Sequence, residues 1–226
     1  MLGISIYRKV LIYALHKQFM FDLHVHTCYS ADGKEKPETI IKYLKKRGFK
    51  GMAIVDHSTL KGYFNTKNYS DDFLIIPGME IKTDRGHILA FGIEEEIKCT
   101  DADEVIDEVH DKGGISILAH PFRFSSPKIK TDAIEILNGR SFPYQNEKAR
   151  KYAFKKNLPY TAGSDGHYIW EMGRMKTFID ANDVDEIIGK ILRREVEIDG
   201  EMNFWNPVKS QIYSFTSFVG RGFRRV

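Results

Sequence analysis

The feature that most constrains this chain is a series of histidine- and carboxylate-containing motifs placed where short β-rich runs end. The runs are 21–25, 52–56, 73–77, 88–92, 115–119, 133–137 and 159–163. Helical patterns lie between several of them, which is typical of βα units around a parallel sheet. Loops at the carboxyl ends of barrel strands converge on one mouth. The pattern therefore predicts a distorted (βα) barrel of about seven strands, with a doubly wound open sheet as the alternative.

Helices are predicted where apolar periodicity and end signals agree. Pro37 opens a helical stretch that continues to Arg47 and stops at Gly48, which is the proline and glycine placement that helices prefer. Further helices are expected at 102–112, 144–156 and 184–193. Because no repeat or linker divides the chain, we expect one main domain at 20–206, an N-terminal extension or mis-set start at 1–19, and a basic, aromatic tail at 207–226.

Composition narrows the partners and the compartment. The chain of 226 residues has 34 basic and 31 acidic side chains, so its net charge of +3 gives no field for holding long nucleic acid by charge alone. Two cysteines, Cys28 and Cys99, cannot form a disulfide framework, which favours a reducing, cytoplasmic location. No apolar run approaches the roughly 20 residues of a membrane span, so no membrane partner is expected.

The motif residues are candidates for a site that holds several metal ions. His24 and His26 are two apart in a strand-like run, so their side chains share a face. Imidazoles combined with carboxylates suit Zn²⁺, Mn²⁺ or Fe²⁺. At four to six ligands per ion, the set is too large for one metal and predicts two or three divalent ions. The candidates are His24, His26, Asp32, His57, Glu80, His87, His120, Asp165 and His167.

The same motifs resemble those of the PHP (polymerase and histidinol phosphatase) superfamily, in its metal-dependent phosphoesterase branch. They are His24-Val-His26-Thr27, Ser30-Ala-Asp32-Gly33, Asp56-His57, Gly78-Met-Glu80, Ala119-His120-Pro121 and Gly163-Ser-Asp165-Gly-His167. The resemblance covers most of residues 20–180. It implies a distorted TIM-like (βα)7 barrel that binds up to three ions through these nine side chains, with Glu80 as the bridge.

The resemblance also implies a hydrolase that cleaves phosphate ester bonds. A metal-bridging hydroxide would attack phosphorus, and Glu80, His120 and Asp165 would form the catalytic core. Arginine can grip a phosphate through two parallel hydrogen bonds. Arg123, three residues after His120, and Arg174 are therefore the candidate phosphate contacts.

One departure from the family affects the expected substrate. Only 32 residues separate His87 from His120, where nucleotide-hydrolysing members carry a large helical insertion that caps the substrate. The shorter segment predicts a more open mouth, which would admit nucleotides, nucleic-acid ends or small phosphometabolites. A histidinol-phosphate phosphatase is an alternative within the same chemistry. A non-catalytic PHP-like subunit that binds RNA or organises an assembly is the alternative from another class.

Overall fold

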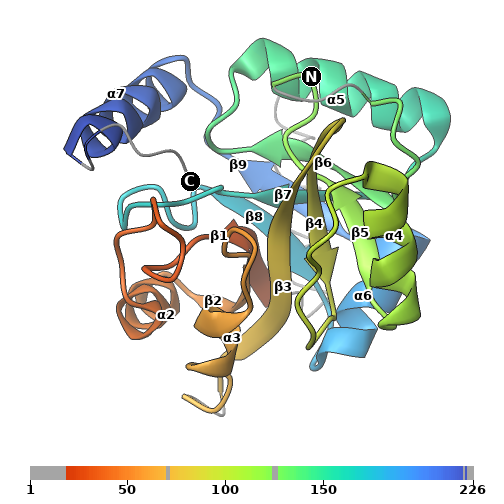
Figure 1. The fold of residues 1–226 in the computed structure, drawn as a ribbon, viewed down its shortest axis with the longest axis horizontal. Helices are drawn as coiled ribbons and strands as arrows, with labels where there is room; N and C mark the ends of the chain where they lie inside the picture. The colour runs from red at the N-terminus through yellow and green to blue at the C-terminus, as the bar shows by residue number, and fades with distance from the viewer. Residues whose placement is uncertain (1–18, 70–71, 124–126, 221, 223–226) are drawn as a thin grey trace, which may run out of the picture.

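The computed structural model describes residues 19–69, 72–123, 127–220 and 222, and its strands form one nine-stranded sheet that curls into a barrel (Figure 1). The strand order is β7-β6-β5-β4-β3-β2-β1-β8-β9. The strands are β1 (Phe19–Val25), β2 (Phe49–Ile54), β3 (Leu74–Thr83), β4 (Gly86–Phe91), β5 (Ile115–Leu118), β6 (Ala133–Asn138), β7 (Tyr160–Gly163), β8 (Met175–Ile179) and β9 (Glu197–Gly200).

Two parallel blocks are joined by an antiparallel strand. The strands β1, β2 and β3 are parallel, as are β5, β6 and β7, while β4 is antiparallel to both β3 and β5. The two-residue turn between Thr83 and Gly86 explains this arrangement, because a parallel crossover needs a dozen residues or more. The antiparallel strand β4 is the point at which the distorted barrel departs from the parallel βα units that the sequence pattern indicated.

The two ends of the sheet approach each other and nearly close the barrel. The hydroxyl of Thr177 on β8 accepts a hydrogen bond from the backbone N–H of Ala162 on β7 and donates one to its carbonyl. A parallel bridge also joins Val25 to Gly166, just beyond β7. The predicted distorted TIM-like barrel is confirmed, and the open doubly wound alternative is wrong because the outer strands meet.

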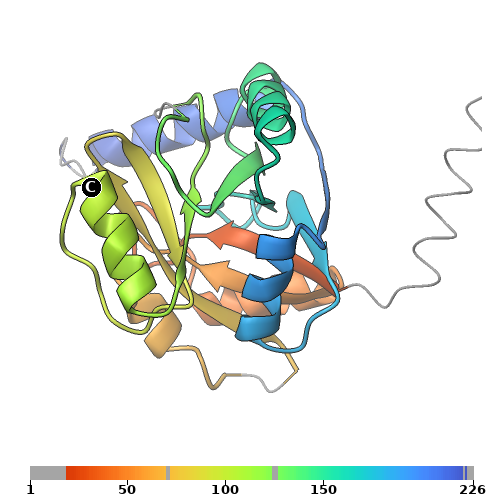
Figure 2. The same cartoon turned by 90° about the vertical axis from the view of Figure 1, so that its right-hand side faces the viewer.

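The helices lie around the outside of the barrel (Figures 1 and 2). Two of them begin at an aspartate that caps free backbone N–H groups: Asp101 before α4 and Asp183 before α6. Each buries apolar side chains against the sheet, such as Val105 and Val109 on α4. The helices are α2 (Pro37–Lys46), α3 (Lys61–Phe64), α4 (Ala102–Asp111), α5 (Pro143–Lys156), α6 (Val184–Arg193) and α7 (Trp205–Gly220).

The end segments were the least accessible to sequence reasoning. The predicted extension at 1–19 lies outside the described residues except for Phe19, which begins β1. The region expected to be a tail from 207 is largely helical, since α7 already begins at Trp205, and this helix lies at the same end of the barrel as α5 (Figures 1 and 2). Among the described residues, no helix is both long and apolar enough to cross a membrane.

Candidate metal centre

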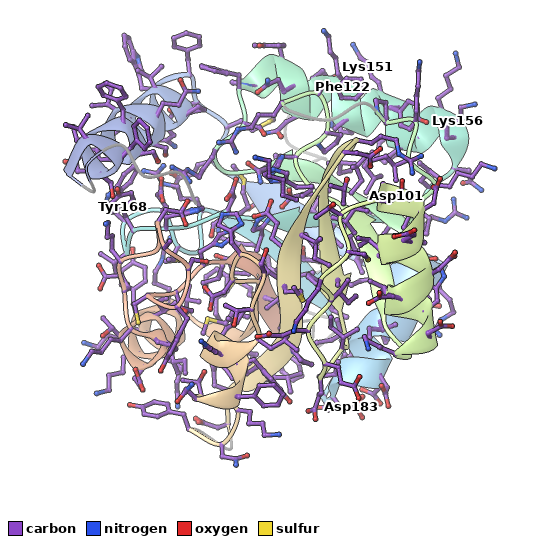
Figure 3. All side chains as sticks on the ribbon, in the orientation of Figure 1. Asp101, Phe122, Lys151, Lys156, Tyr168 and Asp183 are labelled. Carbon is purple, nitrogen blue, oxygen red and sulfur yellow. The ribbon has the colours of Figure 1, made fainter. Side chains whose placement is uncertain are left out.

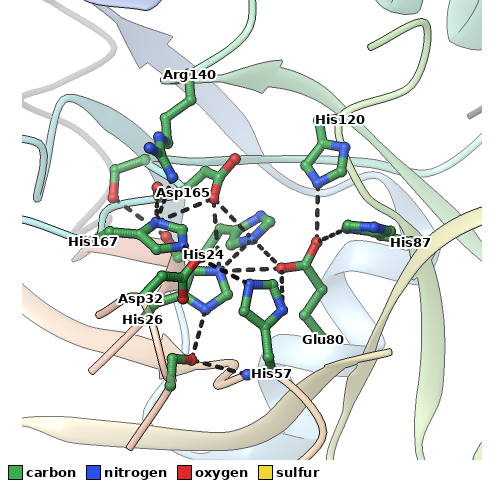
Figure 4. A network of polar contacts seen from close by, with 12 residues as sticks. His24, His26, Asp32, His57, Glu80, His87, His120, Arg140, Asp165 and His167 are labelled. Atoms are coloured by element: carbon green, nitrogen blue, oxygen red, sulfur yellow. Dashed lines mark hydrogen bonds and ion pairs between the residues drawn. The ribbon is translucent and has the colours of Figure 1, made fainter. Parts of the chain in front are cut away.

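The nine predicted ligands converge on one end of the barrel, although their motifs span most of the chain (Figure 4). The strand β1 carries His24 and His26, whose Nε2 atoms are 3.2 Å apart, so the expectation that they share a face is confirmed. His57 follows β2, His120 follows β5, and both Asp165 and His167 follow β7. Glu80 lies within the long strand β3 rather than past its end, and His87 lies across the hairpin on β4.

Glu80 is the centre of the constellation. Its Oε1 atom lies 2.8 Å from His87 Nδ1 and 2.9 Å from His120 Nε2. Its Oε2 atom lies 3.1 Å from His26 Nε2, 3.3 Å from His57 Nδ1 and 3.6 Å from His24 Nε2. A carboxylate with imidazoles on both oxygens has the geometry of a bridging ligand.

Asp165 and Asp32 complete the ring of carboxylates. The Oδ1 atom of Asp165 lies 3.6 Å from the Nε2 atoms of both His24 and His26. The Oδ2 atom of Asp32 lies 3.1 Å from His167 Nε2. Its other oxygen, Oδ1, is buried without a hydrogen-bond partner among the described residues. Because a buried carboxylate oxygen without a partner is costly, it is suited to a bound cation. We call Asp32, Glu80 and Asp165 the inner carboxylates.

The ligand atoms are close enough to hold metal ions. Three groups of side chains each offer one atom within 4.8 Å of the others. Glu80 belongs to two of these groups, as the predicted bridge requires. Imidazole with carboxylate fits the divalent transition metals. The groups are His26, His57 and His167; His24, His26 and Glu80; and Glu80, His87 and His120.

The electrostatics of the centre follow from packing many titratable groups into a buried space. Burial, together with the neighbouring His167 and His57, lowers the pKa of His26 to about 3. Burial also lowers the pKa of His57, but Glu80 and Asp32 outweigh it and raise the value to about 9. Burial raises the pKa of Glu80, yet the surrounding histidines hold it well below its ordinary value. The carboxylates are thus ionised and ready to bind cations.

A second group of buried carboxylates orients the ligands instead of facing the centre. Asp56 accepts hydrogen bonds from the backbone and hydroxyl of Thr27 at 2.6 and 2.7 Å and from the Ser30 hydroxyl at 3.0 Å. That Ser30 hydroxyl lies 3.2 Å from His26 Nδ1. Glu135 lies 3.0 Å from His24 Nδ1 and accepts the backbone N–H of His120 at 2.8 Å.

Asp22 and Glu171 hold the backbone of the site in place in a similar way. Asp22 accepts the backbone N–H groups of Ser164 and Gly173 at 2.9 and 2.7 Å. Glu171 accepts the backbone N–H of His167 at 2.8 Å. We call Asp22, Asp56, Glu135 and Glu171 the outer carboxylates.

Sequence reasoning did not identify Asp22, Glu135 and Glu171 as functional residues. For Glu135, a signal was present, because a charged residue in the middle of the apolar run 133–137 needs a buried partner. Asp22 carried a similar signal, since it precedes His24 and His26 at the strand period of two. Only the fold shows which histidine each carboxylate contacts.

The backbone is held in unusual conformations where two ligands leave their strands. His120 has φ of 29° and Asp165 has φ of 52°, in the region that residues with a side chain rarely adopt. Such conformations persist where the surroundings over-determine them, and they cluster at functional sites. Glycine is needed at a nearby crossing, because a Cβ at Gly163 would lie 2.3 Å from His24 Cβ. The barrel thus closes tightly behind the centre.

A cavity of about 320 Å³ opens over the ligands. Two arginines line it besides the ligands: Arg123, whose Nη1 lies 2.7 Å from Asp165 Oδ2, and Arg140, whose Nη1 lies 2.8 Å from His167 Nδ1. Gln211 and Ser214 of α7 line another part. A helix far along the chain therefore contributes to the wall of the cavity.

Arg174 is not one of the described residues that line the cavity. Its guanidinium lies 4.5 Å from the ring centroid of Trp170. The prediction that Arg174 contacts the phosphate was wrong. The turn 164–174 explains the error, since Gly173 bends the chain away from the mouth after His167 (φ of 68°).

Other proteins are similar to this chain in sequence or in fold. An uncharacterized protein of Methanocaldococcus jannaschii, MJ0417, is 32% identical over 169 residues, which are 67% of this chain and 67% of that protein. A two-domain protein of Bacteroides vulgatus containing a predicted PHP-like metal-dependent phosphoesterase is similar with a TM-score of 0.70 at 18% identity. The match covers 82% of this chain and 66% of that one. PsfC of Pseudomonas syringae has a TM-score of 0.65 at 14% identity, over 88% and 98% of the two chains.

The matches to solved structures show the fold alone. The matches to sequence families show which family the chain belongs to. Residues 22–161 match the PHP domain, and residues 143–196 match a PHP-associated region. The first match includes seven of the nine predicted ligands, and Asp165 and His167 follow directly after it within the second. This chain, with its distorted barrel and its ring of histidines around Glu80, belongs to the PHP family.

Proposed function

We propose that this protein is a hydrolase that cleaves a phosphate ester with two or three divalent ions bound by the nine ligands. The observation that carries the proposal is Glu80, whose carboxylate contacts five imidazoles and whose two oxygens serve separate ligand groups. A purely structural carboxylate would be expected to accept backbone N–H groups, as the outer carboxylates do. A carboxylate that bridges ions fits this arrangement better.

The ions would contribute an activated water at neutral pH and would offset the charge of the phosphoryl oxygens. The protein side chains would position the ions and the substrate and shield them from water. Arg123 lies at the cavity wall with its guanidinium on Asp165, from which it can also reach a phosphate oxygen in the cavity. Glu135 and Ser30 hold the rings of His24 and His26, so the ligand atoms keep their directions.

The substrate we favour is a small ester such as a nucleotide or a phosphometabolite. The cavity volume of about 320 Å³ lies at the lower end of small-molecule pockets. Gln211 and Ser214 supply uncharged polar groups opposite the ligands, which suits the non-phosphate part of a substrate. A nucleic-acid end would have to pass beside α7.

The test is hydrolysis of chromogenic phosphate monoester and diester substrates by metal-stripped protein after Mn²⁺, Zn²⁺ or Fe²⁺ is added back. We expect turnover that depends on the metal and is lost in His120→Ala. The matched control is His110→Ala, since His110 lies on α4 in an exposed pair with Asp132 and outside the cavity. Equal turnover in the two variants, or none in the metal-loaded wild type with any ester, would contradict the proposal.

A further inference from the structure

Arg140 is a buried cation in the wall of the cavity. It follows β6, its side chain is only 7% exposed, and its guanidinium reaches toward His167 (Figure 4). It forms an ion pair with Glu171, whose Oε1 lies 3.4 Å from Nε, but neither of these two atoms has a hydrogen-bond partner among the described residues. A buried guanidinium is costly unless its charge and its N–H groups are satisfied. This partial pairing leaves Arg140 suited to a further anion.

Holding α7 on the barrel does not account for the charge of Arg140. Its Nη2 donates hydrogen bonds to the carbonyl of Ser210 and to the hydroxyl of Ser214. However, Tyr168 also holds α7, since its hydroxyl donates to the carbonyl of Tyr213 at 3.0 Å and the two rings are in contact. Tyr168 lies beside α7 in Figure 3. A neutral donor is sufficient for such a tether, so the guanidinium has another partner to serve.

The other terminal nitrogen of Arg140, Nη1, faces the metal centre. It lies 2.8 Å from His167 Nδ1, which also lies 2.9 Å from the carbonyl oxygen of Asp165. A guanidinium only donates and a carbonyl only accepts, so one ring nitrogen cannot satisfy both. If Nε2 of His167 binds a cation, the proton of the neutral ring is on Nδ1 and is donated to the carbonyl; if Nδ1 binds the cation, its lone pair is used. In either case Nη1 loses this acceptor when the centre binds its ions.

An anion in the cavity can replace the lost acceptor. Arg140 and Arg123 both line the cavity, and Arg123 Nη1 lies 2.7 Å from Asp165 Oδ2. The planar donors of a guanidinium match the oxygens of a phosphate. Among the described residues, the carboxylates that line the cavity are the three inner ones, whose charge bound ions would offset. Two guanidiniums beside those ions therefore favour the phosphate with the larger negative charge. A phosphate monoester carries close to two negative charges at neutral pH, whereas a diester carries one.

The size of the cavity favours the same class of ester. A diester must place two substituents, whereas a monoester places one, and the volume of about 320 Å³ already includes Gln211 and Ser214 of α7 in its wall. We propose that the substrate is a phosphate monoester whose phosphate is held between Arg123 and Arg140, an inference that rests on the hydrolase proposed above.

The first test compares the binding of inorganic phosphate and of dimethyl phosphate to Mn²⁺-loaded protein by isothermal titration calorimetry. At mildly alkaline pH, where inorganic phosphate is mainly a dianion, it should bind more tightly than the diester. Arg140→Met should weaken phosphate binding roughly 10- to 100-fold, the range for losing a hydrogen bond to a charged group. The matched control is Arg150→Met, because Arg150 pairs with Glu147 on the outside of α5 and should not affect binding. Equal affinity for the two anions, or unchanged phosphate binding in Arg140→Met, would overturn the proposal.

A titration of metal-stripped protein with Zn²⁺ separates phosphate binding from a role in orienting His167. Because the contact between Arg140 and His167 is lost when ions bind, Arg140→Met should bind Zn²⁺ at least as tightly as the wild type. Weaker Zn²⁺ binding with an unchanged circular dichroism spectrum would show that Arg140 serves the ligand and would overturn the proposal. If Arg140→Met does not fold, Arg140→Lys replaces it in both tests, since lysine keeps the charge but lacks the planar fork.

Turnover tests the class of substrate without any variant of Arg140. The metal-loaded wild type should hydrolyse nitrophenyl phosphate with a kcat/KM roughly tenfold or more above that for bis(nitrophenyl) phosphate, since the diester offers fewer charged oxygens to the two arginines. A higher kcat/KM for the diester would overturn this inference and leave the phosphoesterase in place. No turnover of either ester would contradict the proposed function itself, and this inference with it.

Discussion

Glu80 and Asp165 among the inner carboxylates are as deeply buried as the outer carboxylates, but the two groups differ in their main partners. The outer carboxylates accept backbone N–H or hydroxyl groups, as Asp56 does from Thr27 and Ser30. The inner ones face imidazoles, as Glu80 does on both oxygens. Burial raises the pKa of Asp22 to about 6, against its hydrogen bonds from Ser164 and Gly173, whereas the histidines around Glu80 hold its pKa well below the ordinary value.

This difference separates stability from chemistry. A carboxylate that is satisfied by the backbone belongs to the framework, and its removal leaves N–H groups unpaired. A carboxylate that is surrounded by metal-binding side chains has no such partner in the framework, and its removal costs the site more than the fold. Variants of the inner carboxylates and of Asp22 should therefore fail in different assays, whereas Glu135 also contacts His24 and should affect the site.

The largest effect is expected at Glu80. Glu80→Gln keeps the shape but removes the charge that five imidazoles face. Turnover should fall by more than the roughly 10- to 100-fold typical of changes outside the ligand set. The metal content per chain, measured by plasma mass spectrometry, should fall as well. Glu147→Gln on the outside of α5 is the control, and full metal content in Glu80→Gln would refute the bridging role.

Glu135→Gln should give the next largest effect. It weakens the contact with His24 Nδ1 and the bond from the His120 backbone while leaving all nine ligands in place. Loss of an orienting partner costs roughly 10- to 100-fold in metal affinity or activity. A titration of metal-stripped protein with Zn²⁺ measures that affinity directly. If affinity and turnover both equal those of the wild type, the outer carboxylates do not orient the ligands.

Metal removal should lower thermal stability by a moderate amount. Ions present at a hundred times their dissociation constant stabilise by about 2.7 kcal/mol, which for a domain of this size corresponds to a Tm change of roughly 5–11 °C. Differential scanning calorimetry with and without a chelator measures the shift. Glu80→Gln should show a smaller shift than the wild type. An equal shift in both would indicate that the ions bind elsewhere.

Asp22→Asn should give the smallest effect on turnover and a clear one on folding. The amide would present an N–H₂ group to the backbone N–H of Gly173 or Ser164, leaving a buried donor unpaired. We expect the free energy of unfolding to fall by about 1–3 kcal/mol. Urea denaturation measures it. A variant that unfolds like the wild type but loses most of its turnover would erase the distinction between the two groups.

The sequence predicted which side chains gather at one end of the barrel better than it predicted the strands that carry them. His24 and His26 share a face because the strand period is two, and His120 and Asp165 follow strands as expected. Glu80 was placed past a strand, but β3 runs on to Thr83 because it forms a hairpin with β4. The strands β8 and β9 were missed, since nothing in their short runs distinguishes them from loops until they close the sheet beside β1.

The contacts around the ligands could not be predicted from the sequence in the same way. Arg174 and Arg123 carry the same charge and both follow motif residues, yet only Arg123 lines the cavity. Arg140 contacts His167, which is 27 residues away along the chain, and two residues of α7, which are 70 and 74 residues away. Long-range partners of this kind depend on where loops turn and on how the barrel closes.

The sequence alone determined which side chains of this protein can bind metal, and that several of them follow strands, because residue type and strand period are local properties. The tertiary structure decided which carboxylates face the centre and which hold the framework, and it decided that α7 lines the cavity with Gln211 and Ser214. Those outcomes depend on packing between distant segments, and burial has no local signature until the segments meet.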